Sequence, residues 1–136
     1  MSNAKNETVK SSDFKNKVVL IHFWSAKHKD FDKEMKALDD IQKKMNNPSV
    51  IFLKINTDKN IGEWRKAVKK FKKDKYQVFG NDANTYTQNI YQYFELNSTN
   101  ATKIIMDKKG NLAQSIKSQF NENELLVALR NEFVKK

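Results

Sequence analysis

The side chains that could carry chemistry in this chain are few. Its 136 residues include no cysteine and two histidines, His22 and His28. Without a thiol the chain can form no disulfide, offer no thiolate nucleophile and build no cysteine-ligated metal site. His28 stands between Lys27 and Lys29, just before a segment that should start a helix at Asp30. These positive charges and the positive helix end favour a neutral imidazole, the form that binds metals or acts as a base.

No second ligand supports a metal at His28, because no other histidine or cysteine is near in sequence and Asp30 and Asp32 are explained as helix-start residues. We therefore expect no metal site and no cofactor. His22 lies inside an apolar run, which favours a structural role. The sequence also lacks a G-x-S-x-G elbow, a Walker loop and an RNA-binding motif, so it predicts no serine hydrolase or nucleotide site.

The element that positions His28 is a strand followed by a helix. Val18–Trp24 is an almost continuous apolar run, which predicts a strand buried on both faces. Asp30 should cap the next helix, with Asp32 and Glu34 in its first turn, where the helix dipole favours negative charge. The helix should pack through one apolar stripe: Phe31, Met35, Leu38, Ile41 and Met45.

The remaining pattern predicts a mixed α/β layout. Val50–Ile55 is a second apolar strand, and its helical connection to the first predicts a parallel pair. A helix should span Asn60–Lys72, followed by a short strand at Tyr76–Phe79. A short helix is predicted around Tyr86, Ile90 and Phe94. A hairpin should join Lys103–Met106 to Asn111–Ile116 through Gly110, and a last helix, with Asn121 and Glu124 as its capping box, should bury Leu125, Leu126, Leu129 and Phe133.

The first strand and helix resemble the active-site segment of the thioredoxin superfamily, most closely the TlpA/ResA branch (AhpC/TSA-type) of extracytoplasmic thiol-disulfide oxidoreductases. That branch reads F-W-A-x-W-C-x-x-C-x-x-E-x-x-x-L. Phe23, Trp24, Glu34 and Leu38 match this frame. The two cysteine positions hold other residues: they are His28 and Phe31, and Lys27 replaces the second tryptophan.

A second segment resembles the family's P-T-x-F-L-I-D-x-x-G-x-I motif. It runs from Ala101 to Asp107 and continues with Gly110 and Leu112. The family's cis-proline is Ala101 here. A non-proline cis peptide bond costs about 2.5–4 kcal/mol, so we expect a trans bond at this position. The resemblance covers most of Phe14–Phe133.

This resemblance implies a thioredoxin-like three-layer α/β/α sandwich with a mixed central sheet of about five strands. The strands that contain Tyr76, Val50, Val18, Ile104 and Asn111 should lie side by side in that order. Residues 14–136 should form the domain. Residues 1–13 should be a polar tail, whose first four residues resemble a cloning remnant.

The first functional hypothesis is a redox-inactive domain that acts as a protein-binding, peptide-binding or structural module, because thiol-disulfide exchange needs a thiolate that this chain lacks. The resemblance implies a peptide-like partner at the vestigial motif and at the strand edge beside it. The motif positions are Trp24, Lys27, His28, Lys29, Asp30 and Phe31, and the expected binding residues are Trp24, His28, Ala101 and Thr102. The alternatives are an oxidoreductase relative with altered chemistry at His28 and a weak basic polyanion binder.

The polyanion alternative depends on charge alone. The net charge is +10, and the helix predicted at Asn60–Lys72 has a basic outer face. Lysine is abundant throughout the chain, which favours a solvated lysine-rich surface, and we do not expect nucleic acid as a partner. No apolar run approaches the roughly 18 residues that a membrane span needs. The resemblance implies an extracytoplasmic location, in the periplasm or cell envelope.

Overall fold

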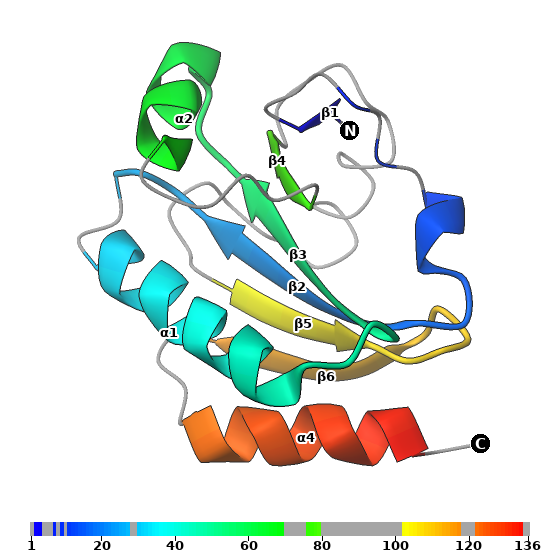
Figure 1. Ribbon diagram of the computed structural model, residues 1–136. Coiled ribbons are helices and arrows are strands. Elements are labelled where there is room, and N and C mark those ends of the chain that lie inside the picture. The colour runs from blue at the N-terminus through cyan, green and yellow to red at the C-terminus, as the bar shows by residue number, and fades with distance from the viewer. Residues whose placement is uncertain are drawn as a thin grey trace.

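The computed structural model describes residues 2–3, 7, 9, 11–27, 30–69, 76–79, 102–117 and 122–134. Within them, helices and a single mixed sheet form an α/β domain (Figure 1). The strands are β1 (Ser2–Asn3), β2 (Val18–Trp24), β3 (Val50–Asn56), β4 (Gln77–Phe79), β5 (Thr102–Met106) and β6 (Leu112–Lys117). The helices are the short 3-10 helix η1 (Ser11–Phe14), α1 (Phe31–Met45), α2 (Ile61–Val68) and α4 (Glu122–Val134).

The sheet has the predicted strand order. It runs β1-β4-β3-β2-β5-β6, with β2 and β3 parallel from Val18 opposite Val50 to Trp24 opposite Asn56. β5 is antiparallel to β2, and β6 is antiparallel to β5 across a turn in which Gly110 has a φ of 83°. β2 is therefore central, and its side chains are buried along its whole length, as its apolar sequence predicts.

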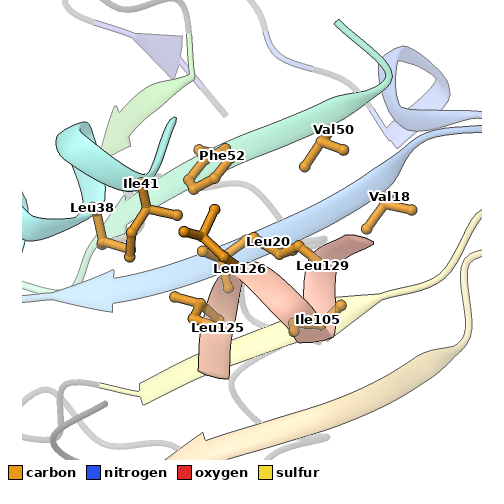
Figure 2. Close-up of a cluster of buried hydrophobic side chains, with 10 residues drawn as sticks. All are labelled: Val18, Leu20, Leu38, Ile41, Val50, Phe52, Ile105, Leu125, Leu126 and Leu129. Carbon is orange, nitrogen blue, oxygen red and sulfur yellow. The ribbon is translucent and has the colours of Figure 1, made fainter. Parts of the chain in front are cut away.

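The two faces of the sheet bury separate apolar clusters. On one face, α1 and α4 pack over the strands through ten buried side chains (Figure 2): Val18, Leu20, Leu38, Ile41, Val50, Phe52, Ile105, Leu125, Leu126 and Leu129. On the other face, alternate residues of the same strands, such as Ile21 and Leu53, pack with Val9, Phe14 and Tyr76. The alternation along each strand supplies both faces.

The prediction of a polar tail at residues 1–13 was wrong for the described part of that segment. Ser2 and Asn3 pair antiparallel with Phe79 and Val78, which adds a sixth strand to the five expected. Val9 is only 2% exposed and belongs to the second apolar cluster. This segment has no hydrophobic periodicity, because a two-residue strand and the apolar residue Val9 are too short to produce any.

The helix ends agree with the sequence in part. Asp30 occupies the N-cap position of α1, but its side chain makes no capping hydrogen bond, contrary to our expectation. Asn46 ends α1 in the left-handed conformation, with φ of 41°. α2 begins as predicted after Asn60 and is described as far as Val68. The predicted continuation to Lys72, the short helix near Tyr86, and Asn121 of the capping box lie outside the described residues.

Asn60 gives a direct test of the start of α2. Its side-chain oxygen accepts hydrogen bonds from the backbone N–H of Gly62 at 2.8 Å and of Glu63 at 3.2 Å. Asn60→Ala should lower the free energy of unfolding by about 1 kcal/mol, because these two N–H groups lose their acceptor. Asn60→Asp retains an acceptor and should change it much less. Urea denaturation measures both, and equal stability of the alanine variant and the parent would refute the cap.

Candidate functional site

The vestigial motif lies where the chain leaves β2 and enters α1, at the carboxyl end of the parallel strands. Trp24, the last residue of β2, is 1% exposed. Its indole N–H donates a hydrogen bond to Oε1 of Gln77 on β4 at 2.8 Å. Its ring stacks on Phe31, the first residue of α1, with centroids 5.6 Å apart and planes 19° apart. Trp24 therefore joins the two ends of the motif loop to the sheet.

Asp58 holds the first half of this loop. Its carboxylate accepts hydrogen bonds from the Ser25 hydroxyl, from the Ala26 backbone N–H at 2.8 Å and from the Asn56 amide at 2.9 Å. The Ser25 oxygen in turn accepts the Lys27 backbone N–H at 3.1 Å. Because Asp58 is buried, these bonds exchange little with water, and they fix the backbone from Ser25 to Lys27.

The strand ends are tied together at the same place. The backbone carbonyl of Trp24 accepts hydrogen bonds from the Thr57 backbone N–H at 2.8 Å and from the Thr57 hydroxyl at 3.1 Å. Asn56 and Asp58 also bond to each other through the Asp58 backbone N–H and Oδ1 of Asn56, 2.9 Å apart. The end of β3 therefore forms a buried polar platform beneath the motif loop.

The structure places some of the predicted site residues and leaves others undescribed. Lys27 and Asp30 are exposed, and Phe31 is half-buried, so these residues can meet a partner. Trp24 was predicted as a binding residue, but its burial makes it a support for the loop. The backbone of Thr102 pairs with Phe23 of β2, which places the start of β5 beside the loop. His28, Lys29 and Ala101, with the predicted trans bond at Ala101, lie outside the described residues.

A second polar group lies deeper, on the sheet face that α1 covers. His22 of β2 stands opposite Lys54 of β3 and Lys103 of β5, so one histidine and two lysines form a row across the sheet. All three are buried. Lys54 donates a hydrogen bond to Oε1 of Gln42 on α1 at 3.2 Å. Along β2 the row lies between Leu20, which belongs to the apolar cluster of Figure 2, and Trp24, which precedes the motif loop.

Glu34 supplies the negative charge for this row. Its Oε2 lies 3.5 Å from Nε2 of His22 and 3.8 Å from Nζ of Lys103. Glu34 belongs to the first turn of α1, and its backbone N–H donates to the Asp30 carbonyl at 3.0 Å. The glutamate of the motif frame thus has a structural use in this chain, since its carboxylate fastens the start of α1 to the sheet.

Burial sets the protonation of the row. It lowers the pKa of His22 from the usual 6.5 to about 4, and the charges of Lys103 and Lys54 add to this effect while Glu34 opposes it. Burial also lowers the pKa of Lys103, again against the attraction of Glu34. His22 is therefore neutral at pH 7, as a structural histidine should be. Neither of its ring nitrogens has a hydrogen-bond partner among the described residues.

Sequence reasoning missed both Asp58 and the buried row. A signal was available for the row, because Lys54 and Lys103 interrupt two strands predicted to be apolar, and a buried lysine needs a counter-charge. No sequence pattern singled out Asp58, which follows the predicted strand Val50–Ile55. Within the described ranges no three histidine, aspartate or glutamate side chains gather in a way that could hold a metal ion.

The fold and the motif loop together define a thioredoxin-like domain: a central β2 parallel to β3, an antiparallel β5–β6 hairpin, and a helix that starts directly after the motif. Residues 16–112 match the sequence profile of a family described as thioredoxin-like. This match spans more than half of the chain, which therefore belongs to that family. No curated protein matches the chain in sequence.

Solved structures of thiol-disulfide proteins share the fold. A thioredoxin family thiol:disulfide interchange protein from Chlorobium tepidum superposes with a TM-score of 0.79 and 12% identity over 98% of this chain and 91% of that chain. The exposed lipoprotein thioredoxin Etrx1 of Streptococcus pneumoniae gives 0.76 and 17% identity over 96% of both chains. The thioredoxin domain of a Bacteroides vulgatus thiol-disulfide oxidoreductase gives 0.72 and 22% over 96% and 86%.

These structures share the fold of the chain at low sequence identity. The chain departs from the chemistry in their names, since it holds no cysteine at any position. No helix in the described part of the chain is long and apolar enough to cross a bilayer.

Proposed function

We propose that this protein is a redox-inactive thioredoxin-like domain that binds an extended polypeptide segment at the vestigial motif loop. The observation that carries the proposal is the buried platform under a loop without thiols. Asp58 accepts three hydrogen bonds to hold Ser25, Ala26 and Asn56, although no cysteine needs to be positioned. A buried polar network of this kind costs desolvation, and a binding surface that must keep its shape gives it a use.

The half-buried ring of Phe31 and the exposed Lys27 border the fixed loop, and the start of β5 lies beside it. This arrangement offers an apolar contact and a positive charge to an extended chain that lies along the loop. The resemblance to an exposed lipoprotein thioredoxin supports a location in the cell envelope.

The absence of redox activity can be tested with a standard assay. The protein should not accelerate insulin reduction by dithiothreitol above the rate of the buffer alone, because no thiolate is present to attack a disulfide. A thioredoxin with an intact C-x-x-C motif serves as the positive control. Protein-dependent acceleration would contradict redox inactivity.

Binding at the motif loop is tested with a polypeptide whose thiols are blocked. The S-alkylated insulin B chain, labelled with fluorescein, should show saturable anisotropy on titration with the protein. Phe31→Ser should weaken this binding at least several-fold, because the apolar contact beside the loop is lost. The matched control is Asp40→Ser, an exposed position on the same helix. Equal affinities of the parent and Phe31→Ser would refute the proposed surface.

A further inference from the structure

The outward side of α4 differs from that of α1. Both helices bury apolar side chains on the sheet (Figure 2). The exposed side of α1 carries six charged residues: Asp32, Lys33, Lys36, Asp40, Lys43 and Lys44. The exposed side of α4 carries Val127, 54% exposed, and Val134, 71% exposed. A helix that only meets water should be polar on its outer side, so solvation accounts for α1 and not for α4.

A shallow groove runs along this side of α4. Its described lining is Asn123, Glu124, Val127, Ala128, Asn131, Glu132 and Val134. The charged members of that lining are Glu124 and Glu132, which form one border of the valine stripe, whereas Arg130 lies at the opposite border. The groove is thus apolar with an acidic border, on a chain whose net charge is +10.

The complementary surface is on α2. The third large apolar side chain that is exposed in the described residues is Ile61, at 44%, in the first turn of α2. At about 100° per residue, Arg65 and Lys69 follow Ile61 along the same side of the helix. Both are exposed, as is Lys66 beside them. Glu63 lies on the opposite side of α2. The face that Ile61, Arg65 and Lys69 form, here called the Ile61 face, is therefore apolar and basic.

These two surfaces belong to distant parts of the molecule. α2 lies at the top of Figure 1 and α4 at the bottom, with α1 between them, so one molecule cannot bring them together. We propose that the α4 groove binds the Ile61 face of α2 from a second copy of this chain. Ile61 would enter the valine stripe, and Arg65 and Lys69 would pair with Glu124 and Glu132.

The charges favour this arrangement over an antiparallel α4–α4 pair. An antiparallel α4–α4 pair with two-fold symmetry would bring the acidic borders of both copies together, which opposes association. The α4–α2 contact uses two different surfaces, so a pair of copies still has one free groove and one free α2 face, and association continues head to tail. The occupant is a second copy because the chain itself supplies the basic, apolar helix that the groove fits.

Sedimentation velocity over a concentration series in about 0.15 M salt tests the proposal. The parent should show a weight-average mass that rises with concentration above the monomer mass of 15.9 kDa. A variant with a basic groove, Glu124→Lys/Glu132→Lys, and a variant with an acidic α2, Arg65→Glu/Lys69→Glu, should each remain monomeric because like charges then meet.

Mixing gives the decisive result. An equimolar mixture of the two variants should regain the rise in mass, since the basic groove of one fits the acidic α2 of the other. Lys33→Glu/Lys36→Glu on exposed α1 changes the net charge as much as the α2 variant does and should associate like the parent. Circular dichroism confirms that each variant is folded. A monomeric parent at every concentration, association retained in either variant alone, or no recovery on mixing would overturn the proposal.

Discussion

Asp58→Ala should lower the free energy of unfolding by about 3 kcal/mol and disorder the motif loop. The buried carboxylate accepts hydrogen bonds from Ser25, Ala26 and Asn56, and alanine leaves these three donors without their acceptor in a site closed to water. Removing one partner of a buried charged network costs the desolvation of the groups left behind, which exceeds the net worth of the bonds themselves.

Two controls separate this effect from a general loss of charge. Asp58→Asn keeps one acceptor oxygen and should destabilise the protein less than alanine does. Asp40→Ala, on the exposed side of α1, should change stability by no more than about 0.5 kcal/mol. Chemical denaturation gives the three values, and NMR gives the order of the Ala26 and Lys27 amides. An Asp58→Ala variant as stable as Asp40→Ala would show that the platform does not hold the loop.

Acid should destabilise the protein through His22. The folded protein holds the pKa of His22 near 4, whereas the unfolded chain has the usual 6.5. Below pH 6.5 the unfolded state therefore binds a proton that the folded state does not, so stability is lost as the pH falls toward 4. At about 1.4 kcal/mol for each pH unit, the loss across this window is about 3 kcal/mol.

His22→Leu removes the titrating group and keeps an apolar side chain of suitable size. The difference in unfolding free energy between parent and variant should therefore change with pH between 6.5 and 4 and become constant above that window. The groups that face His22 are Lys54 of β3, Lys103 of β5 and Glu34 of α1. Parallel pH profiles of the parent and His22→Leu would contradict a buried neutral histidine.

The fold could be predicted because its signals are local. The apolar run of β2, the acidic first turn of α1 and the turn at Gly110 each follow from neighbouring residues, and the family frame then fixes the strand order. The absence of cysteine is read directly from the sequence. These features required no knowledge of which residues meet across the sheet.

The interior of the site could not be predicted, because it depends on register. His22, Lys54 and Lys103 become neighbours only when three strands are aligned, and Glu34 meets them only when α1 lies over that row. Asp58 likewise reaches Ser25 across 33 residues of sequence. The N-terminal segment escaped prediction for a different reason, since its described residues contribute a short edge strand and the buried Val9, which leave no periodic pattern.

The central claim is that the motif loop binds an extended polypeptide while the Asp58 platform holds its shape. The most direct measurement is an NMR titration of the labelled protein with the S-alkylated insulin B chain, in the parent and in Asp58→Ala. We predict saturable shifts at Ala26, Lys27, Phe31 and Thr102 in the parent, and at least a several-fold weaker affinity in Asp58→Ala at a temperature where it is folded. Shifts confined to other surfaces, or equal affinity in the two proteins, would contradict the account.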